Sequence, residues 1–125
     1  MTDFGEYRAH RPARVVLIID DLEYGGAQRQ VVETANNLDP ELFDVHVCCL
    51  DDYVPLAKTL RNKDRRFHVV KKKWKTDFTV VFRLAKLLRK LRADIVHSFL
   101  FSADIAARLA GRLAKLKILL HETLD

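Results

Sequence analysis

The sequence predicts an α/β fold in which a single parallel sheet of about five strands is covered by helices on both faces. Three observations lead to this prediction. Short apolar runs alternate with segments in which apolar residues recur at helical spacing, the connections are short, and the first run, RVVLIID at 14–20, is apolar nearly throughout. A continuous apolar run is typical of a strand buried on both faces, and strands that alternate with helices form parallel sheets. Right-handed crossovers then give a doubly wound sheet in the order 3-2-1-4-5.

The elements follow from the same periodicities. We expect strands at 14–20, 43–50, 67–72, 94–99 and 117–121. We expect helices at 27–38, 54–63, 77–93 and 102–116. The first helix ends at Asp39-Pro40, because proline disfavours helical backbone in the residue before it. An architecture of this kind is Rossmann-like.

The length of the chain suits one domain. It has 125 residues, of which 49% are hydrophobic, and a chain of this size buries roughly two thirds of its unfolded surface. We expect a flexible arm over residues 1–12 and a single domain over 13–125. The arm has charges but no apolar stretch of the secretory type, and no apolar run approaches the roughly 18 residues that span a bilayer.

The two cysteines, Cys48 and Cys49, are adjacent in a predicted strand. Neighbouring strand side chains point to opposite faces, so a disulfide between them is not expected, and the spacing is not that of a metal site. We expect two small buried apolar side chains, no metal, and a reducing cytoplasmic location. His46 and His68, in the strands nearby, are expected to be structural or solvated.

A glycine pair in the loop after the first strand is the strongest candidate for a binding site. Gly25 and Gly26 lie directly before the helix at 27–38. In a doubly wound sheet, ligands bind beyond the carboxyl ends of the strands where the strand order reverses, here between the first and fourth strands. Unpaired N–H groups at a helix start favour an anion, and glycines let it approach the backbone closely. Two interpretations stay open: a phosphate site, or a tight turn without a ligand.

Three acids precede the glycines: Asp20, Asp21 and Glu23. Carboxylates repel a phosphate but accept hydrogen bonds from the hydroxyls of a sugar or polyol, so we expect them to hold an acceptor. The alternative is a solvated loop. The longer glycine fingerprints of dinucleotide and P-loop sites, GxGxxG and GxxxxGK[ST], are absent, which argues against both classes of protein.

Two stretches together resemble the N-terminal domain of family 4 glycosyltransferases. They are ARVVLIIDDLEYGGAQRQVVETANNLDPELFDVHVCCL and DIVHSFLFSADIAARLAGRLAKLKILL, and the resemblance covers roughly residues 13 to 123. Enzymes of this family are two-domain proteins of the GT-B type that move a sugar from a nucleotide-sugar to an acceptor with retention of configuration, usually without a metal. The resemblance implies that Gly25 and Gly26 approach the donor diphosphate, that this domain mostly holds the acceptor, and that no cofactor is needed besides the nucleotide-sugar co-substrate.

The resemblance also implies a catalytic histidine just after the fifth strand. His121 is the nearest candidate, whereas an ungapped register places Thr123 or Leu124 there. His97, near the end of the buried fourth strand, is the second catalytic candidate. A buried structural histidine is the alternative interpretation of His97.

A basic segment follows the acidic first half of the chain. Residues 1–57 hold 4 Lys/Arg and 11 Asp/Glu, whereas residues 58–92 hold 14 Lys/Arg and 2 Asp/Glu. Aromatic side chains lie among the cations of this segment, and the candidate membrane-surface residues are Lys71, Lys72, Lys73, Trp74, Lys75 and Phe82. Basic residues with aromatics suit an anionic membrane surface. A solvated outer face of a packing helix is the alternative, and a nucleic-acid surface is not supported by any recognised motif.

The sequence therefore predicts the acceptor-side half of a retaining glycosyltransferase, with little activity alone because a cleft needs two walls. We expect as partners a nucleotide-sugar donor, a sugar, polyol or lipid-linked acceptor, an anionic membrane surface and a donor domain, which the 125 residues do not contain and which a separate chain could supply. The expected location is cytoplasmic or peripheral on the inner face of the membrane. The competing hypothesis is a non-catalytic module that uses its basic face to bind membrane or nucleic acid.

Overall fold

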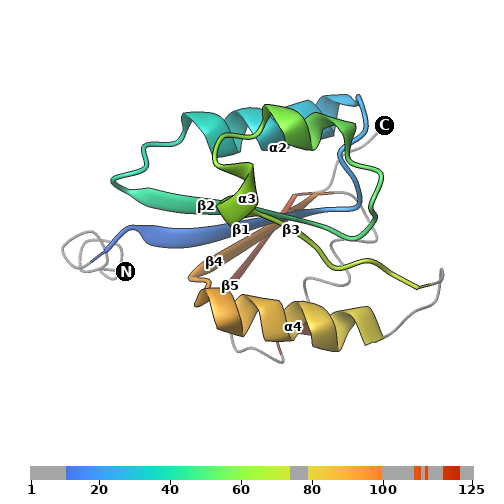
Figure 1. The fold of residues 1–125 in the computed structure, drawn as a ribbon. Helices are drawn as coiled ribbons and strands as arrows, with labels where there is room; N and C mark the ends of the chain where they lie inside the picture. The colour runs from blue at the N-terminus through green and yellow to red at the C-terminus, as the bar shows by residue number, and fades with distance from the viewer. Residues whose placement is uncertain (1–10, 74–78, 100–108, 111, 113–116, 122–125) are drawn as a thin grey trace.

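The fold is a parallel sheet between two layers of helices, as Figure 1 shows. The computed structural model describes residues 11–73, 79–99, 109–110, 112 and 117–121. Five parallel strands pair in the order β3-β2-β1-β4-β5. The strands are β1 (Ala13–Ile19), β2 (Phe43–Cys49), β3 (Phe67–Val69), β4 (Ile95–Phe99) and β5 (Lys117–His121). The predicted Rossmann-like, doubly wound topology is confirmed.

Helices lie on both faces of this sheet. α2 (Gly26–Asn37), the 3₁₀ turn η1 (Pro55–Thr59) and the short α3 (Lys63–Arg66) cover one face, and α4 (Thr79–Leu91) covers the other (Figure 1). Of the predicted helix at 102–116, residues 109, 110 and 112 are helical, and the rest lies outside the described residues. No helix within the described ranges has the length and apolarity that crossing a bilayer requires.

The prediction of one helix over 54–63 is wrong. The chain forms η1, then turns through Asn62, whose φ of 55° lies in the left-handed region, and only then begins α3. Leu56 and Leu60 are both buried on the α2 side of the sheet and lie at helical spacing, but the left-handed backbone at Asn62 ends the helical path after them. The strand expected at 67–72 ends at Val69.

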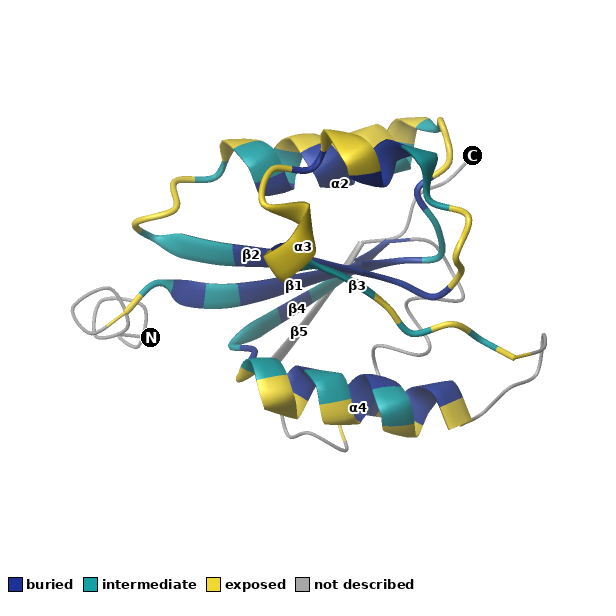
Figure 2. Ribbon diagram, viewed as in Figure 1, coloured by how far each residue is buried: buried dark blue, intermediate teal, exposed yellow. Residues whose placement is uncertain are grey.

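The core is divided in two by the sheet, and β1 contributes to both halves. Val16 and Ile18 belong to the cluster that α4 covers, whereas Val15, Leu17 and Ile19 belong to the cluster that α2 covers. Figure 2 shows β1 buried along most of its length. The apolar run at 14–20 is therefore buried on both faces, as its lack of alternation predicts.

The cysteines lie on opposite faces of β2, as predicted. Cys48 packs in the α4 cluster and Cys49 in the α2 cluster, and both are free thiols. Burial raises the pKa of Cys48 to about 12 and also raises that of Cys49. Both thiols therefore stay protonated at neutral pH and act as small apolar side chains.

Truncating the buried face of α4 should destabilise the protein far more than truncating its exposed face. Leu84 is fully buried against the sheet, whereas the side chain of Phe82, on the same helix, is 65% exposed. We expect Leu84→Ala to lower the free energy of unfolding by about 2 to 5 kcal/mol. We expect the matched control Phe82→Ala to change it by less than about 0.5 kcal/mol. Urea denaturation followed by circular dichroism measures both, and similar losses would contradict the placement of α4.

Candidate functional site

The candidate site is the loop from Asp20 to Gly26, at the carboxyl end of β1 (Figure 1). The loop after β2 packs beside it. The Leu22 amide donates to the Tyr53 carbonyl at 3.3 Å, and the Leu56 amide donates to the Leu22 carbonyl at 3.0 Å. These bonds hold the two loops together and bring the acids that follow β2 close to those that follow β1.

Asp21 organises this loop. Its Oδ1 accepts hydrogen bonds from the Glu23 amide and from Gln28 Nε2, both at 3.1 Å. A side-chain hydrogen bond with Asp21 and the repulsion of its charge raise the pKa of the exposed Glu23 carboxylate. Asp21 thus ties the loop to the first turn of α2, a role that the sequence did not reveal. Glu23 points to solvent, and Asp20 is half-buried.

The two glycines have different structural roles. Gly25 is the N-cap of α2 in an extended conformation, and a Cβ there would overlap Gln28 Oε1. A side chain at position 25 would therefore displace the flexible end of Gln28 from the place where Asp21 holds it. At Gly26 a Cβ would meet nothing within 4 Å. Contacts among the described residues therefore give no reason for a glycine at 26, and none of these residues occupies the space over it.

The first turn of α2 presents unpaired donors to that space. The helix has no side-chain N-cap hydrogen bond and no acid in its first turn. Its first internal acceptor, the Gly25 carbonyl, bonds the Arg29 amide at 3.0 Å. The hydrogen bonds within the described residues leave the N–H groups of 26–28 without an acceptor. Such a helix start favours an anion.

The candidate histidines lie on β4 and β5. His97 pairs in register with Leu17 of β1, and its half-buried ring stacks on Phe99 with 4.6 Å between ring centroids. His121 is the last residue of β5 and pairs with Phe99. The side chain of His121 lies outside the described residues. The structure therefore places His121 at the edge of the sheet where the glycine loop lies, whereas His97 is the middle residue of β4.

Comparison with known proteins gives the family. Residues 24–122 match the family model described as Glycosyltransferase Family 4. The chain belongs to this family. Its fold is similar to the crystal structure of a glycosyltransferase from Rickettsia africae ESF-5, with a TM-score of 0.65 and 19% sequence identity. The similarity covers 86% of this chain and 29% of that one, so the chain spans less than a third of that protein's length. A search of curated proteins found no match.

The basic surface of this family 4 domain lies on α4 and on the segment before it. Lys86, Arg89 and Lys90 are exposed beside Phe82. Of the preceding lysines, Lys71 is paired with Asp52 at 2.9 Å. Lys72 is half-buried and Lys73 is exposed. Trp74 and Lys75 lie outside the described residues.

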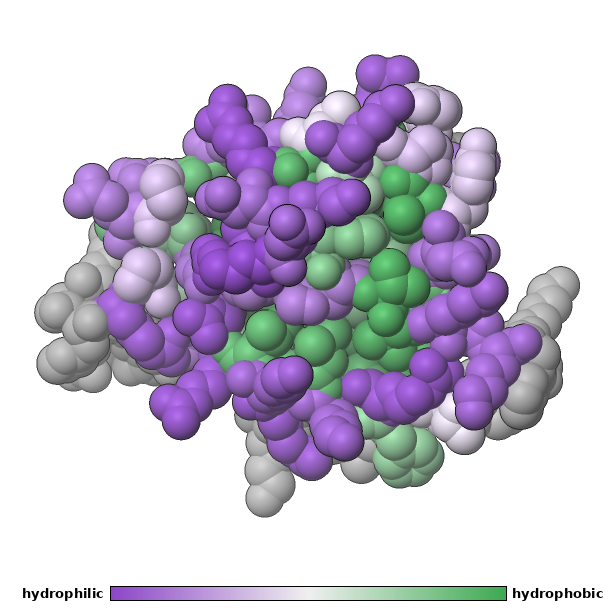
Figure 3. Space-filling view, in the orientation of Figure 1, coloured by the Kyte–Doolittle hydropathy of each residue, from purple (hydrophilic) through white to green (hydrophobic). Residues whose placement is uncertain are grey.

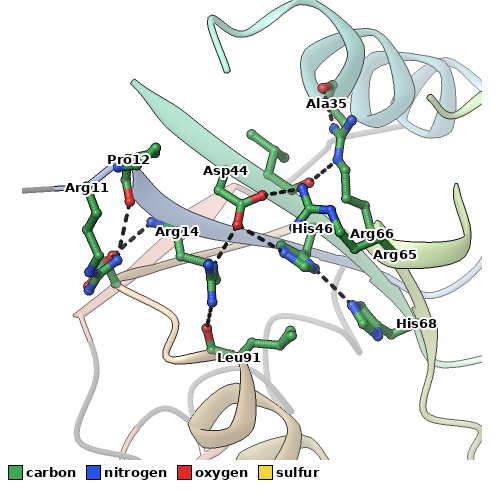
Figure 4. Close-up of polar contacts among 12 residues, drawn as sticks. Arg11, Pro12, Arg14, Ala35, Asp44, His46, Arg65, Arg66, His68 and Leu91 are labelled. Atoms are coloured by element: carbon green, nitrogen blue, oxygen red, sulfur yellow. Dashed lines mark hydrogen bonds and ion pairs between the residues drawn. The ribbon is translucent and has the colours of Figure 1, made fainter. Parts of the chain in front are cut away.

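The sequence did not predict a polar network at the opposite edge of the sheet, which Figure 4 shows. Asp44, at the start of β2, accepts from Arg14 Nε at 2.8 Å and from Arg65 at 3.0 Å, and lies 3.4 Å from His46 Nε2. His46 Nδ1 is in turn 3.0 Å from His68 Nε2. Burial would raise the pKa of Asp44, but the hydrogen bond from Arg65 and the nearby positive charges lower it. No local pattern in the sequence signals contacts between residues so far apart.

The histidine pair should make stability depend on pH. Burial lowers the pKa of both His46 and His68; the Asp44 charge opposes this at His46, and Lys90 adds to it at His68. Below the ordinary histidine pKa of about 6.5, the unfolded chain therefore binds protons that the native state does not. We expect the free energy of unfolding to be level between about pH 7 and 8 and to fall as the pH drops below 6.5.

The control for this pH dependence is His68→Gln, which removes one of the two titrating imidazoles. In this variant the free energy of unfolding should fall less steeply between about pH 6.5 and 5. Asp44 remains ionised in this range because its pKa is lowered, so it does not contribute to the slope. Urea denaturation at several pH values gives the curve. An unchanged slope in the variant would contradict a neutral, buried imidazole pair.

Proposed function

We propose that this family 4 domain is the acceptor-side half of a retaining glycosyltransferase of the GT-B type. The observation that carries the proposal is the start of α2, where the N–H groups of 26–28 find no acceptor among the described residues, beside the point between β1 and β4 where the strand order reverses. Membership of the family supports it. The reaction would transfer a sugar from a nucleotide-sugar to an acceptor hydroxyl.

The donor diphosphate would lie at the mouth of α2. As the bond between the sugar and the diphosphate breaks, negative charge grows on the leaving phosphate oxygen. The N–H groups of 26–28 and the positive end of the helix dipole would stabilise that charge. Gly26 leaves room for a phosphate oxygen to reach the backbone. Gly25 contributes indirectly, because it accommodates the Gln28 side chain that ties the loop to Asp21.

The acceptor would lie against the acidic part of the loop. Asp20 and Glu23 offer carboxylate oxygens to acceptor hydroxyls, while Asp21 holds the loop in shape. We keep His121 as the candidate for the catalytic histidine because it ends β5 at the edge of the sheet where the glycine loop lies. The stacking of His97 on Phe99 suits a residue that positions the floor of the site.

A second wall would complete the cleft. The loop from Asp20 to Gly26 would supply one side of a site, without groups that recognise a base and ribose. We propose that a donor domain, on the same protein or on a separate chain, supplies them, and that the protein acts in the cytoplasm. This chain alone should then bind nucleotides weakly and turn over little.

The phosphate role can be tested on this chain by NMR. We expect uridine diphosphate to shift the amide signals of 26–28, because its phosphates bind those N–H groups. Gly26→Val should weaken this binding by about tenfold or more, since the side chain fills the open space while leaving the fold intact. The matched control, Thr34→Val, places the same side chain in the middle of α2 and should bind like the wild type. Shifts that survive in Gly26→Val would reject the phosphate role.

We also propose that the enzyme works at an anionic membrane surface. The exposed Phe82 among exposed cations of α4 favours this over a purely solvated helix face, which needs no aromatic side chain. A membrane-bound enzyme would reach a lipid-linked acceptor without that acceptor leaving the bilayer. A nucleic-acid surface would use the same cations, so the experiment has to separate the two.

Vesicle co-sedimentation tests this second proposal. We expect binding to anionic but not neutral vesicles, weakening as salt shortens the Debye length below about 8 Å. Changing the four lysines of KKKWK to glutamine should remove most of the binding, because each basic residue contributes about 1 kcal/mol near the surface. Lys71 should contribute least, since Asp52 already neutralises it. Trp74→Ala should weaken the binding that remains at high salt.

The control for the vesicle experiment is Lys58→Gln, which removes an exposed charge from η1, on the other face of the sheet. It should leave vesicle binding unchanged. Equal binding to neutral and anionic vesicles would reject the electrostatic model. A short DNA duplex that binds tightly when vesicles do not would instead support the nucleic-acid hypothesis.

A further inference from the structure

A hollow of about 400 Å³ lies at the amino-terminal edge of the sheet, opposite the glycine loop. It is bordered by the starts of β1 and β2, the end of α2, and α3. In Figure 3 hydrophilic side chains gather over α3 and the adjacent ends of these strands. The charged residues that line the hollow are Arg11, Arg14, Arg61, Arg65, Arg66 and Asp44. Five cations thus face one carboxylate.

The ion pairs around the hollow do not balance these charges. Asp44 is shared between Arg14 and Arg65. Arg11 is paired with Asp94, which approaches it at 2.7 Å from outside the lining. Counting both carboxylates against the five arginines leaves three positive charges that the described ion pairs do not compensate.

Arg66 is the fixed, buried member of the group, with only 8% of its surface exposed. Its Nε donates to the Val45 carbonyl at 2.6 Å, and its two terminal nitrogens donate to the carbonyls of Arg61 and Ala35. Neutral carbonyls hold the guanidinium in place but do not cancel its charge. Burial lowers the pKa of Arg66, and the charges of Arg65 and Arg61 lower it further, so like charges crowd around it. The charge of Asp44 opposes this effect without reversing it.

Arg61 and Arg65 keep hydrogen-bond donors that the described contacts do not use. Both are exposed, and each uses little of its donor capacity. The Arg61 guanidinium makes one long bond, 3.3 Å, to the Asn36 carbonyl, and Arg65 makes one to Asp44. A guanidinium has five N–H donors in a planar fork that matches the oxygens of a phosphate. Two such forks therefore point unused donors toward the hollow from α3 and the turn before it.

We propose that this hollow is a second anion site, which binds a small phosphate-bearing molecule through Arg61 and Arg65 over the fixed charge of Arg66. The volume falls within the range of about 300 to 1,000 Å³ that is usual for small-ligand sites. The phosphate group could belong to a soluble metabolite or to a lipid headgroup, since the guanidiniums would recognise both in the same way. The hollow is at the other end of β1 from the glycine loop, so its ligand is neither the donor nor the acceptor of the proposed transfer.

Calorimetry with inorganic pyrophosphate tests the site on the full chain at constant ionic strength. We expect the double variant Arg61→Gln/Arg65→Gln to weaken binding by at least about tenfold, because charge-assisted hydrogen bonds are lost. Arg61→Gln alone should weaken it less, and it keeps the pair between Arg65 and Asp44. The matched control, Arg29→Gln/Lys58→Gln, removes two exposed charges that do not line the hollow and should leave binding unchanged.

Two further arms separate this site from others and identify the source of the phosphate. Gly26→Val should still bind pyrophosphate through Arg61 and Arg65, because Gly26 lies at the opposite edge of the sheet. This result does not depend on whether the glycine loop binds a phosphate. Vesicles that contain phosphatidic acid present the same group in a lipid. Loss of vesicle binding in the double variant would assign the site to a headgroup, and loss of pyrophosphate binding alone would assign it to a soluble ligand. Binding that is unchanged by the double variant in both arms overturns the proposal.

Discussion

Burial of β1 on both faces is the constraint from which the rest of the structure follows. Val16 and Ile18 need a cover on one side, and Leu17 and Ile19 need one on the other. The connections between the strands must therefore pass over both faces of the sheet. α2 accordingly lies on one face and α4 on the other (Figure 1). Right-handed crossovers to opposite faces reverse the strand order at β1, and doubly wound sheets bind ligands at the carboxyl end of the strands at such a point. The glycine loop lies there because it is the connection that leaves this strand.

Local sequence patterns correctly predicted the elements whose apolar residues follow a single periodicity, either that of a strand or that of a helix. The apolar run of β1 and the helical spacing of α2 and α4 were sufficient for those elements. The segment at 54–63 failed because distant contacts decide its shape. Arg66 looks in the sequence like one more member of a basic run, yet its guanidinium bonds the end of α2 and the start of β2 and draws α3 onto the sheet. Such a bond joins residues more than twenty positions apart, and no local rule detects it.

The sequence predicted the position of the candidate site but not the separate roles of its residues. The sequence located the loop after β1 through its glycines, and it gave Gly25 and Gly26 the same role. The structure separates them, because a Cβ at Gly25 would collide with Gln28 whereas one at Gly26 would meet open space. It also separates the acids, since Asp21 is occupied by the Glu23 amide and by Gln28. These differences depend on where one side chain crosses the loop, which composition and spacing do not encode.

The two ends of the sheet carry opposite charge, and this bears on how a donor could bind. At the carboxyl edge, Asp20, Asp21 and Asp51 are close enough together that all three raise the pKa of Cys49 beneath them, after the larger effect of its burial. The nearby Lys71 is paired with Asp52. A diphosphate at the mouth of α2 would gain the helix dipole but meet these carboxylates, and a dipole contributes only about 0.3 to 2 kcal/mol. Under the proposed function, tight binding of a donor would need further cations, and a second wall could supply them. The charge of the loop, and not only its shape, therefore supports the proposal that this domain forms half of a site.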